Sequence, residues 1–240
     1  MKRAMVIAVV VGTFFGFSGQ SFADMSNSGS EAIANIQRVH RLMGRAMGMV
    51  TEGASLVLVA NMKIAPPTDS ITAGQGMKMI ENGKDLVKMA LAGEGMSAME
   101  KKEMEGAPMM MVAKSLGDSI LEYIKIVENM GMSGTIESKI KLHQTHRMIN
   151  HALDMAAEGA NLVMLGNLEL AEVLDKYSVE QGRMMLKDAR ATLAGVSDSE
   201  AMKDMKQTDK GAMDDTMMTK TNELIKTALK IIDALERMSM

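Results

Sequence analysis

The sequence contains no cysteine and no tryptophan, and aromatic residues make up 2% of it. Without cysteine the chain forms no disulfide, offers no thiolate to a metal ion, attaches no c-type haem covalently and has no thiol for a lipid anchor. It also has neither a basic patch nor a series of exposed rings on which bases could stack. Nucleic acid is therefore not expected as a partner.

An export signal is predicted at the N-terminus. A basic start at residues 1–3 precedes an apolar run over residues 4–17, and residues 21–23 place small side chains at the cleavage-site positions. The run is shorter than the ~20 residues that cross a bilayer. We therefore expect residues 1–23 to be a signal peptide cleaved after Ala23. The mature protein is expected to be soluble, without a membrane span, and periplasmic or secreted.

Cleavage changes the composition. All four phenylalanines lie in the signal segment, so the mature chain keeps Tyr123 and Tyr177 as its aromatic residues, together with 28 methionines. Its formal net charge becomes −5. Because methionine is unbranched and adaptable, part of its abundance is explained by filling core gaps where a ring would otherwise sit.

A helical seam, with apolar residues at alternating steps of four and three, runs from Ile36 to Ile64 and returns 106 residues later. Two polar residues, a histidine and an asparagine, occupy the same places in both copies. The first copy is Ile36, His40, Met43, Met47, Val50, Ala54, Val57, Asn61 and Ile64, and the second is Leu142, His146, Ile149, Leu153, Ala156, Ala160, Val163, Asn167 and Leu170. Ten of the 23 positions from His40 to Met62 are identical in the two copies.

This pattern predicts an all-α fold, a duplicated bundle of long antiparallel helices. Each repeat is expected to contain a long helix, a medium helix, a Met-rich linker and a second medium helix. The repeats span residues 24–132 and 133–240 and are expected to pack together as one assembly. In the first repeat we expect the long helix to run to about Ile64 and the next helix to follow Ser70. In the second repeat the equivalent start is Ser178.

Two further features of the repeat bear on packing. Pro108 fits the first turn of the third helix, whose counterpart in the second repeat lies 108 residues later. An internal glycine recurs in both long helices, at Gly53 and Gly159. Since glycine costs ~1 kcal/mol in a helix interior, its recurrence predicts a close approach to another helix.

Enzyme motifs are missing from the sequence. It has no HExxH, no GxxxxGK[ST] and no GxSxG. A di-iron bundle site needs a glutamate three residues before a histidine, and the residues at that position are Gln37, Ile140, His143 and Met148. We therefore expect no enzymatic activity.

The histidines, with nearby methionines, are the residues that favour a metal site. Imidazole and thioether together suit Cu(I) and Ag(I), and an exported protein without thiols needs such ligands. Histidines 143 and 151 have no histidine counterpart in the first repeat, which favours a ligand role over a repeated structural one. The predicted metal ligands are His40, Met43, Met47, His143, His146 and His151. The leading hypothesis is an exported, non-catalytic bundle that binds copper or silver.

Two other interpretations stay open. In the first, the seam histidines are core residues whose ring nitrogens are satisfied across the bundle. The protein would then be an interaction adaptor of the cell envelope with a protein partner and no metal. Alternatively, methionines in the polar linkers, such as Met99, Met104 and Met205, would scavenge oxidants through reversible sulfoxide formation. The sequence predicts no oligomeric state.

Overall fold

The computed structural model describes residues 29–63, 66–93, 96, 107–130, 136–167, 172–198 and 215–239. The predicted signal peptide lies outside these residues, as do residues 97–106 and 199–214, which contain most of the Met-dotted linkers. The descriptions below concern the described residues alone.

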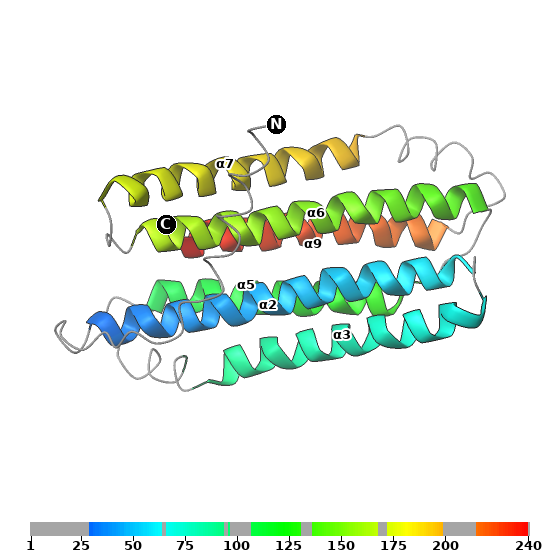
Figure 1. The fold of residues 1–240 in the computed structure, drawn as a ribbon, viewed down its shortest axis with the longest axis horizontal. Coiled ribbons are helices and arrows are strands. Elements are labelled where there is room, and N and C mark those ends of the chain that lie inside the picture. The colour runs from blue at the N-terminus through cyan, green and yellow to red at the C-terminus, as the bar shows by residue number, and fades with distance from the viewer. Residues whose placement is uncertain are drawn as a thin grey trace, which may run out of the picture.

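Six α-helices and no strand make up this part of the chain, which confirms the all-α prediction (Figure 1). They are α2 (Gly29–Asn61), α3 (Pro66–Ala92), α5 (Ala107–Glu128), α6 (Ile136–Gly166), α7 (Glu172–Ser197) and α9 (Asp215–Ser239). At ~1.5 Å per residue the longest, α2, is roughly 50 Å long, in agreement with the predicted long helix.

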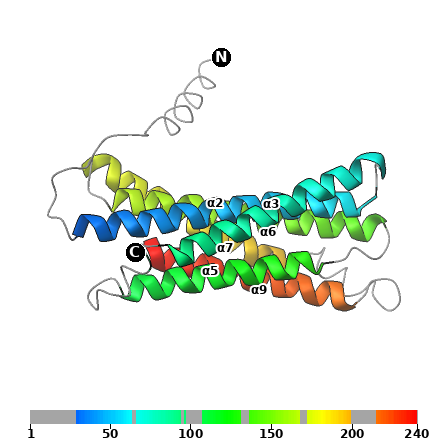
Figure 2. The ribbon, with the colours of Figure 1, turned by 90° about the horizontal axis from the view of Figure 1, so that it is seen from below.

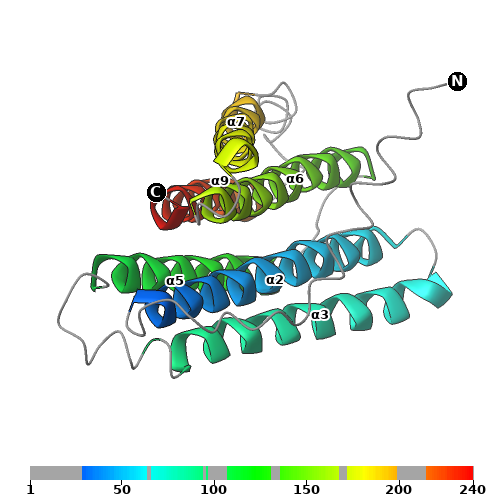
Figure 3. The same cartoon turned by 60° about the vertical axis from the view of Figure 1, so that its left-hand side comes forward.

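The helices form two units of three, one stacked on the other. Figure 3 shows α2 beside α5 and α6 beside α9, with α3 and α7 on the two outer sides. Figure 2 shows α5 and α9 side by side along one edge of the molecule. The units contact each other through α2 with α6 and through α5 with α9. The core lies among these four inner helices and extends onto the inward faces of α3 and α7, where Ile80, Val87, Leu186 and Leu193 belong to it.

Two helix starts were predicted wrongly. Helix α3 begins at Pro66 rather than after Ser70, and α7 begins at Glu172 rather than at Ser178. Pro66 and Pro67 stand in the first turn of α3, which needs no N–H donor and tolerates their fixed φ. Helix α2 ends at Asn61, three residues before the predicted limit, and Lys63 follows with a φ of 57°, the left-handed conformation common after a helix end.

The predicted seam is largely buried. Most of its side chains on both helices are inaccessible to water. On α2 these are His40, Met43, Met47, Val50 and Ala54, and on α6 they are Leu142, His146, Ile149, Leu153, Ala156, Ala160 and Val163. The seam weakens at its C-terminal end, because Val57 and Asn61 are partly exposed and Asn167 is exposed. Asn167 instead donates a hydrogen bond of 2.8 Å from Nδ2 to the carbonyl oxygen of Ser239, which ties the end of α6 to the end of α9.

Each long helix crosses its antiparallel neighbour at a pair of glycines. A Cβ atom on Gly53 would lie 2.6 Å from the carbonyl oxygen of Gly76, and one on Gly159 would lie 2.7 Å from that of Gly182. Real Cβ atoms do not approach an oxygen so closely, so the backbones touch where no side chain fits. This close approach is the packing reason that the repeated glycine predicted.

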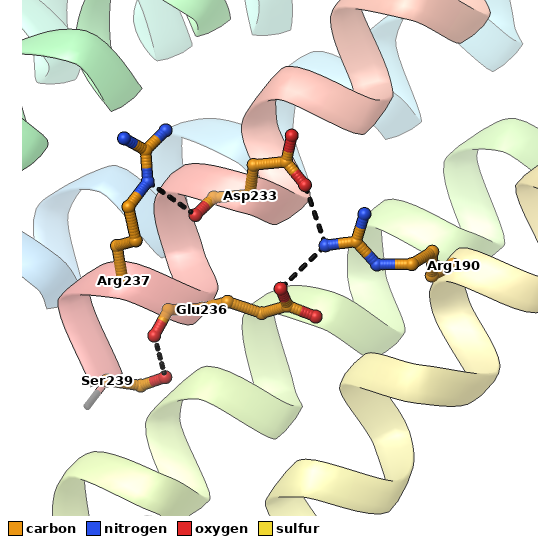
Figure 4. Close-up of polar contacts among 5 residues, drawn as sticks. All are labelled: Arg190, Asp233, Glu236, Arg237 and Ser239. Carbon is orange, nitrogen blue, oxygen red and sulfur yellow. Dashed lines mark hydrogen bonds and ion pairs between the residues drawn. The ribbon is translucent and has the colours of Figure 1, made fainter.

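Ion pairs connect the outer and inner helices. One Nη atom of Arg190 on α7 lies 2.6 Å from Asp233 Oδ1 and 2.6 Å from Glu236 Oε2, both on α9 (Figure 4). In the first unit, Lys84 on α3 pairs with Glu128 on α5 at 3.4 Å. Between the units, Lys230 on α9 pairs with Glu122 on α5 at 2.9 Å. All these groups are partly exposed, so each pair contributes modestly to stability.

Among the described residues, one helical segment is long and apolar enough to cross a membrane by length and composition. It is Gln37–Asn61 in α2, with a mean hydropathy of 1.3 in its 18-residue window, of which 44% is buried inside the molecule. The helix packs against α3, α5 and α6.

Candidate functional site

The crossing of α2 and α6 fixes where the predicted ligands lie. Thr51 Oγ1 donates to Asp154 Oδ1 at 3.1 Å, and Asn150 Nδ2 donates to Ser55 Oγ at 2.9 Å. As residue numbers rise on α2 they fall on α6, so the helices run antiparallel. In this register His146 lies opposite residue 59, nineteen residues along α2 from His40.

The two seam histidines are therefore far apart. Nineteen residues at ~1.5 Å each separate them by about 28 Å along the bundle. A single metal ion bound by both His40 and His146 is excluded by this distance. Any metal site must be built separately at each end.

His40 is buried, and its ring nitrogens lack hydrogen-bond partners among the described residues. Its side chain is 1% exposed, and neither Nδ1 nor Nε2 has a hydrogen-bond partner among the described residues. Burial lowers its pKa to about 4, while the nearby Asn161 amide acts in the opposite direction without reaching hydrogen-bond geometry. The imidazole is therefore neutral at pH 7 and has a lone pair to offer. Met43 and Met47 follow on the same helical face and are also buried.

His143 and His146 form a second group, one helical turn apart on α6. His146 is 1% exposed and its Nε2 lacks a partner among the described residues, as does Nδ1 of the partly exposed His143. Burial, and then the charge of His143, lowers the pKa of His146 to about 3. Burial, and then Arg147, lowers the pKa of His143. Both rings are neutral near pH 7.

His151 does not join this pair. Five residues at ~100° each place it about 140° around the helix from His146, and its side chain is exposed. Its charge instead acts on Asp154, whose pKa it lowers against the larger raising effect of burial. Within the described ranges, no three histidine, aspartate or glutamate side chains converge as a metal site would require. A site at either histidine group therefore needs thioethers or water as further ligands.

A buried polar cluster at the α2–α6 crossing was missed by the sequence analysis. The hydroxyl of Tyr123 on α5 donates to Asn150 Oδ1 at 2.6 Å, and Asn150 Nδ2 donates to the carbonyl oxygen of Thr51 at 2.9 Å. Burial, and then the Asp154 charge, raises the pKa of Tyr123. A signal was available, because the repeat equivalents of Tyr123, Asn150 and Asp154 are Ile231, Gly44 and Gly48. Polar side chains present in one repeat only would have marked the cluster.

Tyr123→Phe is expected to lower the free energy of unfolding by about 1–3 kcal/mol, because it leaves Asn150 Oδ1 buried without its donor. Urea unfolding followed by circular dichroism measures the change. The control is Tyr177→Phe, at a tyrosine that is 62% exposed, where no change is expected. Equal stabilities of the Tyr123 variant and the wild type would contradict a stabilising role for the cluster.

Comparison of the chain with protein-family models, with curated proteins and with solved structures found no significant match.

Proposed function

We propose that this protein is exported and non-catalytic and that it binds a soft metal ion, Cu(I) or Ag(I), through histidine and methionine. The observation that carries the proposal is the buried imidazole of His40, with both ring nitrogens unpartnered among the described residues. Buried polar groups nearly always have a partner, and an exception requires an explanation such as a bound ion.

The surroundings of His40 favour a soft ion over a hard one. Met43 and Met47 supply thioether sulfur, which is a ligand for Cu(I) and Ag(I) and a poor one for Mg²⁺ or Ca²⁺. The three side chains are nearly inaccessible to water, and a neutral, dry set of ligands suits a monovalent ion. The proposed roles are storage, buffering or delivery of the ion.

Anaerobic titration of the mature protein with Ag(I), against a competing chelator, tests this proposal. Two variants are expected to weaken Ag(I) binding at least tenfold, namely His40→Leu and the double variant Met43→Leu with Met47→Leu. Each removes ligand atoms and leaves an apolar side chain of similar size in their place. The control is Met89→Leu with Met184→Leu, two exposed methionines on α3 and α7. If wild type and the His40 variant bind Ag(I) equally, the proposed site is wrong.

A second candidate function is an adaptor of the cell envelope. Three apolar residues at the start of α7 are exposed, namely Val173 at 80%, Leu174 at 67% and Tyr177 at 62%. Clustered exposed apolar side chains are typical of surfaces that bind a partner. Crosslinking in an envelope extract would compare wild type with a variant carrying Leu174→Glu and Tyr177→Glu. The same products from both proteins would count against the adaptor.

A further inference from the structure

The two ends of the bundle carry different potential ligands beside equivalent histidines. On α2, the two seam positions after His40 are Met43 and Met47. On α6, the two seam positions after His146 are Ile149 and Leu153. The thioether sulfurs that follow the first seam histidine are thus replaced by hydrocarbon after the second.

On the N-terminal side of the two seam histidines, the additional ligand is present in α6 and missing from α2. Three residues before His146 stands His143, whereas three residues before His40 stands Gln37. The α6 end therefore has two imidazoles where the α2 end has one. Side chains three apart on a helix are neighbours, with Cβ atoms about 5–6 Å apart, so one ion can contact both rings.

Unpartnered nitrogens occur on both members of this pair. Nε2 of His146 and Nδ1 of His143 are inaccessible to water and without a hydrogen-bond partner among the described residues. His146 itself is almost fully buried, while His143 is partly exposed. Two buried nitrogens without a hydrogen-bond partner among the described residues, one of them on a side chain that reaches solvent, indicate a ligand that enters from the surface.

We infer that His143 and His146 form a separate site for a divalent ion of intermediate softness, such as Cu(II) or Zn(II). Imidazole suits these ions, whereas thioether selects Cu(I). Water completes the coordination on the exposed side of His143. His40 takes no part, because it lies about 28 Å away at ~1.5 Å per residue. The protein would then hold two metals of different softness at its two ends.

Titration of the metal-free mature protein with Cu(II), with glycine as competing ligand, tests this inference. The wild type is expected to bind one Cu(II) whose electron paramagnetic resonance spectrum shows nitrogen hyperfine coupling from two imidazoles. His143→Gln, at a partly exposed position, is expected to weaken binding at least tenfold and to remove one nitrogen coupling. His151→Gln is the matched control on the same helix and should bind as the wild type does. Unchanged Cu(II) affinity in the His143 variant would overturn the site.

A gain of binding gives a second measurement that does not depend on losing a buried residue. Gln37→His creates the same spacing in front of His40 and is expected to add a second Cu(II) per chain. Binding of one equivalent only would contradict the argument from spacing.

The test is independent of the proposed function. His40→Leu is expected to lose Ag(I) binding while keeping Cu(II) binding, and His143→Gln is expected to lose Cu(II) binding while keeping Ag(I) binding. Loss of both ions in both variants would show that the two sites are not separate.

Discussion

Gly76→Ala is expected to lower the free energy of unfolding by about 1–3 kcal/mol or more, the range found for overpacked cores. The new Cβ would lie 2.6 Å from the carbonyl oxygen of Gly53 and 3.0 Å from the Cβ of Leu56. The first contact is with backbone, which cannot rotate away as a side chain can. Helices α2 and α3 would have to separate, and the buried seam on α2 would lose contacts along its length.

The same helix supplies the control. Gly74 is exposed and a Cβ there would meet nothing within 4 Å, so Gly74→Ala should raise stability by about 0.5–1 kcal/mol through helix propensity. Chemical denaturation of both variants measures the difference. In the second unit, Gly182→Ala and Gly195→Ala form the equivalent pair, because Gly195 also faces open space. Stabilisation by Gly76→Ala would refute the close crossing.

Acid is expected to destabilise the metal-free protein through its two buried histidines. Burial lowers the pKa of His40 from 6.5 to about 4 and that of His146 from 6.5 to about 3. Between these values and 6.5 the unfolded chain binds protons that the folded chain does not, so stability falls as pH falls through this window. At pH 5 each histidine is expected to cost about 2 kcal/mol relative to pH 7.

Urea unfolding at pH 7 and at pH 5, in the presence of a metal chelator, measures this cost. The double variant His40→Leu with His146→Leu lacks both titrating groups, so its loss of stability between the two pH values should be smaller than that of the wild type by about 4 kcal/mol. Asp154, whose pKa is raised by burial, is present in both proteins and so cancels in the comparison. An equal loss in both proteins would contradict neutral burial of these histidines.

Much of the fold followed from the spacing of apolar residues. The seam from residue 36 to 64 and its copy on α6 identified the two long inner helices, because a stripe of period 3.5 must be covered on one face. The glycine in each copy identified where a neighbouring helix passes closely. The start of α3 was not predictable by the same reasoning, since Pro66 and Pro67 are compatible both with the end of one helix and with the first turn of the next. At α7 the capping signal at Ser178 lies inside the helix, which begins at Glu172.

The candidate metal ligands follow from the sequence, but their arrangement in space does not. Because α2 and α6 are helical, the sequence spacing puts Met43 and Met47 on the face of His40, and His143 one turn from His146. It did not reveal the antiparallel register of α2 and α6, which depends on long-range contacts such as that between Thr51 and Asp154. That register places His40 and His146 about 28 Å apart along the bundle, at ~1.5 Å per residue, so one ion cannot be bound by both.

The ion pair between Glu122 and Lys230 distinguishes the two halves of the molecule from each other. These residues are 108 apart, the offset at which the third helices of the repeats align, and they meet where α5 and α9 run side by side. Two copies of the first half packed in the same way would place glutamate against glutamate, and two copies of the second would place lysine against lysine. The charges thus favour pairing of unlike halves within one chain over self-association of either half.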